Sequence, residues 1–109
     1  MEKIAFRMQL KAGNIAEYKR RHDAIWPELA DLLSDTGIRD YSIFLDEASG
    51  MLFAVLLRTE NHRMDALPQH PIMQRWWAHM ANLMETEVNS VAPLVVPLLP
   101  MFHLAPHLD

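Results

Sequence analysis

The sequence contains no cysteine and only three glycines among its 109 residues. Without cysteine there can be no disulfide, thiol nucleophile or zinc–thiolate site, which fits a reducing compartment such as the cytoplasm. None of the glycines lies in a G-x-G context, so the sequence has no Gly-rich phosphate loop. These absences exclude thiol chemistry and argue against nucleotide chemistry.

Long apolar runs and a broad basic surface are also missing. The longest apolar run, Met51–Leu57, is far too short to span a bilayer, and the N-terminus has no signal-peptide pattern. The net charge is −4 and the one basic run is Lys19–Arg21, which argues against a nucleic-acid-binding protein. We expect a cytoplasmic protein that forms a single domain over residues 1–109 and binds neither membrane nor nucleic acid.

Hydrophobic periodicity predicts the order of the helices and strands. We expect strands at Lys3–Leu10, Ile38–Asp46, Met51–Arg58 and Met101–Leu104, and helices from Asn14 as N-cap to about Trp26, at Pro27–Asp35 before Gly37, at Asn61–Leu67 before Pro68, and from Pro71 to about Glu85. The prolines of Thr86–Pro100 predict a long loop whose placement stays open. The order β-α-β-β-α-β predicts an α+β fold of the ferredoxin-like type, with helices on one face of an antiparallel sheet.

The second face of such a sheet poses a problem for this chain. A strand with one face in water should alternate between apolar and polar residues, yet Met51–Leu57 is apolar at every position. At about 25 cal/mol per Å² of apolar surface, exposing several of these side chains would cost several kcal/mol. We therefore expect this face to pack against a second copy of the chain in an isologous homodimer.

Two polar residues interrupt the apolar stripe of the first helix. At 100° per residue, Tyr18 and His22 share that stripe with Ile15, Ile25 and Trp26. Buried polar groups need hydrogen-bond partners. Periodicity leaves two interpretations open: core residues satisfied by other protein groups, or a histidine acid/base and a tyrosine hydroxyl that line a pocket.

Other aromatic residues allow the same two interpretations. Trp76 and Trp77 straddle the stripe of the last helix, either as core residues or as a wall with N–H donors for a sugar or another polar ring. Period two places Tyr41 on one face of its strand with Ile43 and Leu45. The pattern does not show whether the Tyr41 hydroxyl reaches a pocket or the surface.

A metal site is not expected. His103 and His107 have the H-x-x-x-H spacing that binds zinc on a helix, but Pro106 lies between them near the chain end. The other histidines show no ligand-like spacing.

Six segments that follow one another along the chain carry a family pattern. They are Ala5–Gln9, Glu17–His22, Ile25–Leu29, Tyr41–Asp46, Leu52–Ala54 and Gln74–Trp77. The run Tyr-x-x-x-His-x-x-x-Trp-Pro-Glu-Leu, together with Arg-Trp-Trp, is the most specific part. By these segments, which span nearly its whole length, the chain closely resembles the L-rhamnose mutarotase family.

The resemblance implies a dimeric α/β barrel of the ferredoxin-like type and interconversion of the α and β anomers of L-rhamnose, without metal or cofactor. It implies that His22 is the proton donor and that Tyr18, Tyr41, Trp76 and Trp77 contact the substrate. The reaction needs one group to protonate the ring oxygen and another to deprotonate the anomeric hydroxyl, and these roles reverse on closure. The sequence does not identify the second group.

Two other functions are compatible with the same fold, because function depends on the site. One is a small oxygenase or haem-handling protein on the dimeric ferredoxin-like scaffold. The other is a binding module that holds a small molecule without catalysis.

Overall fold

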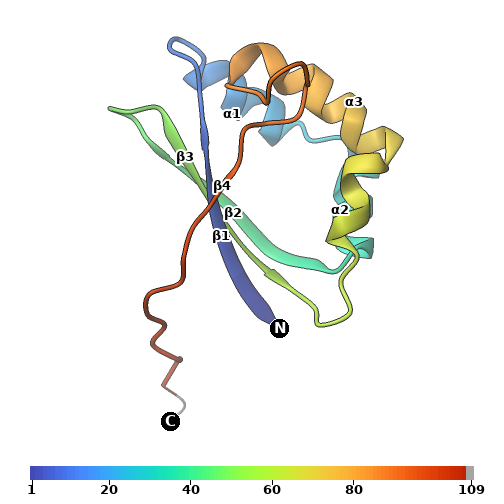
Figure 1. The fold of residues 1–109 in the computed structure, drawn as a ribbon, viewed down its shortest axis with the longest axis vertical. Helices are drawn as coiled ribbons and strands as arrows, with labels where there is room; N and C mark the ends of the chain where they lie inside the picture. The colour runs from blue at the N-terminus through green and yellow to red at the C-terminus, as the bar shows by residue number, and fades with distance from the viewer. Residues whose placement is uncertain (108–109) are drawn as a thin grey trace.

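Four strands form one antiparallel sheet, and the helices lie on one of its faces (Figure 1). The computed structural model describes residues 1–107, so the last two residues of the predicted domain lie outside the described range. The strands are β1 (Glu2–Gln9), β2 (Ile38–Asp46), β3 (Met51–Arg58) and β4 (Val96–Pro97), in the sheet order β2-β3-β1-β4. The helices are α1 (Ile15–Asp23), α2 (Pro27–Asp35) and α3 (Pro71–Met80), with short 3₁₀ segments η1 (Met64–Gln69) and η2 (Ala81–Leu83). The predicted ferredoxin-like α+β fold is confirmed.

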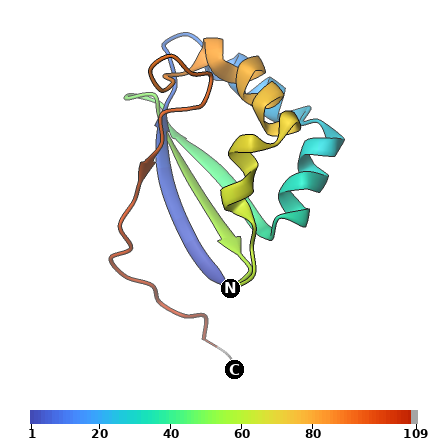
Figure 2. The ribbon, with the colours of Figure 1, turned by 45° about the vertical axis from the view of Figure 1, so that its right-hand side comes forward.

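The core fills the space between the sheet and the helices. Leu52, Ala54 and Leu56 alternate along β3 toward the helices, and each is at most 2% exposed. Leu29 of α2, at 1% exposed, belongs to the same buried cluster. Figure 2 shows the two layers nearly edge-on, with all helices on the same side of the sheet. The alternation of β3 therefore builds the floor of the interlayer space.

Helix α1 is shorter than the sequence predicted. It ends at Asp23, because Pro27 holds Trp26 in an extended conformation with ψ of 130°. The chain turns between the two helices, and the Ile25 N–H donates to the carbonyl of His22 at 3.2 Å. This turn sets α2 at an angle to α1 directly after the histidine.

The predicted helix caps have different outcomes. Asn14 occupies the predicted N-cap position of α1, but its side chain makes no capping bond: the amide donates to the carbonyl of Lys11 at 3.3 Å and, at the distance limit, to that of Leu83 at 3.5 Å. The backbone of Asn14 has ψ of 12°, away from the extended conformation usual at an N-cap. Gly37 follows α2 with φ of +106°, and its N–H donates to the carbonyl of Ser34, so that prediction is confirmed.

The later helices also differ in length from the prediction. Helix α3 ends at Met80 instead of near Glu85 and tightens into η2. The helical segment predicted for Asn61–Leu67 is the 3₁₀ segment η1, and Pro68 lies inside it instead of ending it. No helix in the described range is long and apolar enough to cross a membrane.

The fourth strand is not where the sequence placed it. Met101–Leu104 forms no strand, and β4 lies within the predicted loop. The partners in β1 and β4 are Phe6 with Pro97 and Arg7 with Val96, and the Leu98 N–H donates to the carbonyl of Ala5 at 3.0 Å. Prolines argued against a strand here, but β4 is an edge strand, where a missing N–H is tolerated.

Apolar side chains are exposed at two places away from the helices. On the open face of the sheet, Phe44 is 66% and Phe53 is 36% exposed. After β4 the chain runs away from the body of the molecule on the side of the sheet opposite the helices (Figure 2). There Leu99, Met101, Phe102 and Leu104 are each at least 80% exposed.

Candidate active site

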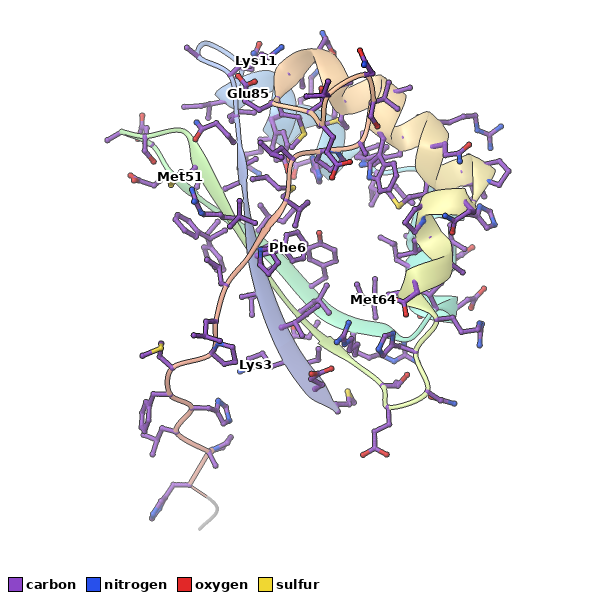
Figure 3. All side chains as sticks on the ribbon, in the orientation of Figure 1. Lys3, Phe6, Lys11, Met51, Met64 and Glu85 are labelled. Carbon is purple, nitrogen blue, oxygen red and sulfur yellow. The ribbon has the colours of Figure 1, made fainter. Side chains whose placement is uncertain are left out.

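A cavity of about 800 Å³ lies between the sheet and the helices, and its lining is mainly apolar. Side chains of both layers point toward each other across this space (Figure 3). The lining includes all five predicted site residues, Tyr18, His22, Tyr41, Trp76 and Trp77. Helix α1, strand β2 and helix α3 therefore bring together residues that are far apart in the sequence.

Tyr18 and His22 lie one helical turn apart and their rings stack. The ring centroids are 4.3 Å apart with an interplanar angle of 27°. Tyr18 is 8% exposed and His22 is partly buried. The stacking follows directly from the i, i+4 spacing on one face of α1.

One hydrogen bond determines which nitrogen of His22 is free. His22 Nδ1 lies 3.1 Å from the carbonyl oxygen of Tyr18. A carbonyl oxygen only accepts, so Nδ1 carries the proton and donates it, and Nε2 of the neutral ring keeps its lone pair. Burial lowers the pKa of His22 below its usual value, although the bond to the Tyr18 carbonyl and the nearby Asp23 oppose this shift. At neutral pH the ring is thus a proton acceptor at Nε2.

Trp76 forms the wall beside the histidine. Its ring meets that of His22 edge to face, with centroids 5.3 Å apart and an angle of 84°, and it is 6% exposed. Trp26 packs edge-on against Trp76 at 5.1 Å, and His79 lies 5.5 Å from Trp26. Trp77 is only partly buried. Trp76 is therefore a core residue that also lines the cavity, and its contact with a sugar stays a prediction.

The two tyrosines face the cavity from opposite layers. Tyr41 comes from β2 and contacts Phe6 of β1 edge to face, with centroids 6.4 Å apart. Burial of its hydroxyl raises the pKa of Tyr41 to about 12. Burial, and the charge that Tyr41 would carry if ionised, also raise the pKa of Tyr18. Both phenols thus stay protonated at neutral pH and can donate hydrogen bonds.

Sequence reasoning missed the residue that ties α1 to α3. The Arg21 side chain is 15% exposed and binds Glu17 of its own helix, with 2.7 Å between Nε and Oε2. Its Nη1 donates to the carbonyl of His79 and, at 3.2 Å, to the side chain of Asn82. A cation is favourable at the carboxyl end of a helix, where carbonyls lack partners. Arg21 therefore holds the helix of His22 against the helix of Trp76.

Two further groups of residues line the cavity, and the sequence pattern does not distinguish them from ordinary core residues. The first is a set of methionines, Met8, Met64, Met73, Met80 and Met84, and the second is Pro93 and Val95 from the loop before β4. Part of the predicted loop Thr86–Pro100 therefore contributes to the cavity wall.

No group of histidine and carboxylate side chains suited to a metal occurs among residues 1–107. His103 and His107 lie on the exposed segment after β4 and do not belong to the cavity lining.

Comparison with known proteins identifies the family. The family model described as L-rhamnose mutarotase matches residues 3–104. The chain belongs to the L-rhamnose mutarotase family. Among curated relatives, an L-rhamnose mutarotase from Jannaschia sp. (strain CCS1) is 62% identical and covers 95% of this chain and 99% of its own length. One from Sinorhizobium fredii is 60% identical and covers 96% of this chain and all of its own length.

A solved structure agrees with this family assignment. The crystal structure of an L-rhamnose mutarotase from Formosa agariphila matches with a TM-score of 0.88 and 37% identity, covering 96% of this chain and all of that one. The structure of Rv0793 from Mycobacterium tuberculosis matches with a TM-score of 0.55 at 16% identity, which shows a shared fold alone.

The tie between α1 and α3 gives a stability prediction. Arg21→Ala removes charge-assisted hydrogen bonds to the end of α3, so we expect the free energy of unfolding to fall by about 2 kcal/mol. Arg20→Ala is the matched control, because Arg20 binds the same carboxylate of Glu17 but is 68% exposed, so it should lower the free energy of unfolding much less than Arg21→Ala. Urea denaturation measures both, and equal losses would show that the contact with α3 contributes nothing.

Proposed function

We propose that this protein is an L-rhamnose mutarotase, an isomerase that interconverts the α and β anomers of L-rhamnose by opening and closing the pyranose ring. Family membership over nearly the whole chain supports the activity. The observation that supports the mechanism is the His22 ring in the cavity with Nδ1 occupied and Nε2 free.

The state of His22 sets the order of the proton transfers. Nε2 takes the proton of the anomeric hydroxyl while the bond between C1 and the ring oxygen breaks and the ring oxygen is protonated, which leaves an open-chain aldehyde and an imidazolium. After rotation about the C1–C2 bond, the former ring oxygen attacks the other face of the aldehyde. His22 then returns its proton to the new anomeric oxygen. The family's proton donor is thus the imidazolium made in the first half-reaction.

The donor to the ring oxygen is a neutral group. The raised pKa values keep Tyr18 and Tyr41 protonated at neutral pH, so neither is ionised to act as a base and each can donate a hydrogen bond to the ring oxygen. Either phenol, or a water held by it, can give a proton to the ring oxygen and take it back on closure. We place Tyr18, Tyr41, Trp76 and Trp77 as substrate contacts around this exchange.

The chemistry of the cavity suits a deoxy sugar. Its polar lining groups include the His22 imidazole and the phenols of Tyr18 and Tyr41, and most of the lining is apolar, rich in methionine and aromatic side chains. Hydroxyls of the sugar can pair with the phenols and the imidazole, and the C6 methyl can pack on methionine or tryptophan. No step of this scheme needs a metal or redox cofactor.

The activity is measured directly by saturation-transfer NMR on the anomeric protons of L-rhamnose. The protein should speed their exchange, and His22→Ala should reduce this acceleration by about 10²–10⁴-fold while the protein stays folded, because one positioned acid/base has this effect. Full rate in the variant would disprove the role of His22. Rhamnose binding without faster exchange would instead show a non-catalytic binding module.

The pH dependence tests the order of proton transfer. Protonation removes the lone pair on Nε2, and burial disfavours the imidazolium, so the pKa of free His22 lies below 6.5. After subtraction of the buffer reaction, kcat/KM should be flat above neutral pH and fall on the acid side with a midpoint below 6.5. Loss of rate as the pH rises through this region would instead mean that His22 starts as the acid.

We further propose that the protein acts as a homodimer in the cytoplasm. Two features support a second copy as the occupant of the open sheet face. That face exposes apolar residues such as Phe53, and the apolar segment 99–104 of the same chain projects on the same side of the sheet (Figure 3). Each copy thus carries both the apolar sheet face and the apolar segment 99–104. In an isologous pair, the same surface of both copies forms the interface. The lack of cysteine is consistent with the cytoplasm.

Sedimentation equilibrium at micromolar concentration tests the dimer. The unaltered protein should have the mass of two chains, and Phe53→Lys should shift it toward one chain by placing a charge in the interface. Val88→Lys is the control, because Val88 is 91% exposed in the loop before β4 and should leave the mass unchanged. A single-chain mass for the unaltered protein would rule the dimer out.

A further inference from the structure

Strand β2 has one residue more than β3 in the stretch that carries Tyr41. Pairing joins Ile38 to Arg58 and Arg39 to Leu57 before this stretch, and Ser42 to Val55 and Ile43 to Ala54 after it. Asp40 and Tyr41 therefore both lie opposite the single residue Leu56. Such a β-bulge shifts the alternation of side chains by one position.

The shift decides which way Tyr41 faces. Ile38 is 6% exposed and faces the helices, so strict alternation from Ile38 would turn Tyr41 toward the open face of the sheet. With the extra residue, Tyr41 lies on the helix-facing side together with Ile43 and Leu45, and all three line the cavity. The contact between Tyr41 and Phe6 of β1 forms on this side.

The bulge depends on the backbone of Asp40. Its φ is +47°, in the left-handed region, and the only other non-glycine residue in this region within 1–107 is Asn89. Glycine adopts this conformation freely, asparagine and aspartate with modest strain, and β-branched residues hardly at all. The residue type at position 40 thus controls whether β2 can take up its extra residue there.

We propose that Asp40 is a positioning residue: its left-handed backbone conformation makes the bulge that turns the Tyr41 hydroxyl into the sugar cavity. The proposal rests on the proposed function in that Tyr41 is there a substrate contact. Asp40 acts through its backbone, so its carboxylate is dispensable even though it lies at the cavity wall.

The test compares three substitutions at this one position, with kcat and KM for anomer exchange measured separately. Asp40→Gly and Asp40→Asn keep the left-handed conformation, so kcat/KM should stay within about threefold. Asp40→Val excludes it and should raise KM at least about tenfold, as expected for loss of a substrate hydrogen bond. If Asp40→Gly or Asp40→Asn loses as much as Asp40→Val, the carboxylate itself binds the sugar and the proposal fails.

A double-mutant cycle shows whether Asp40 acts through the Tyr41 hydroxyl. In a Tyr41→Phe background, Asp40→Val should add less than about threefold, because the hydroxyl is already gone. Fully additive losses would overturn the proposal. Thermal melting checks folding, and Asp40→Ala takes the place of Asp40→Val in the same cycle if the valine variant does not fold.

A readout without sugar separates this proposal from the mutarotase activity. The nuclear Overhauser contact between the rings of Phe6 and Tyr41 should persist in Asp40→Gly and vanish in Asp40→Val. Its persistence in the valine variant would disprove the positioning role whether or not the protein exchanges anomers. Conversely, unaltered protein that fails to speed anomer exchange would disprove the proposed function and leave the contact as the test of the bulge.

Discussion

The hydrogen bond from His22 Nδ1–H to the carbonyl of Tyr18 allows an ionisable ring to lie in an apolar layer. The bond satisfies Nδ1 of the ring from within α1 and leaves Nε2 open to a ligand. It also directs the remaining lone pair away from the helix backbone. Within residues 1–107 no buried side-chain nitrogen or oxygen lacks a partner, so the polar groups of the cavity are compatible with a stable core.

Core packing and the cavity wall share residues in this small chain. Trp76 is buried against Trp26 and also forms the wall next to His22, while Arg21 fastens α1 to the end of α3 from outside the cavity. A domain of this size buries a smaller share of its surface than a large one, so few residues are available to build its core. Core packing between the two layers therefore also holds the cavity-lining side chains in position, and no separate supporting loop is needed.

Strands and helices with clear periodicity could be predicted closely, and their ends could not. The bounds of β2, β3 and α2 agree with the prediction, because alternation, proline and glycine mark them locally. The position of β4 was wrong, since a two-residue edge strand is defined by hydrogen bonds to β1 that no local pattern records. The family resemblance named the five site residues, but the state of His22 came from a distance between two atoms.

The sequence by itself determined the fold class, the apolar stripe bearing Tyr18 and His22, and the family. These follow from the period of side chains along single elements and from motifs read in order. Only the tertiary structure decided that residues from α1, β2 and α3 meet in one cavity, and that Arg21 clamps two helices. It alone also showed that a bulge at Asp40 turns Tyr41 inward. Each of these depends on contacts between segments distant in sequence, and local periodicity does not encode such contacts.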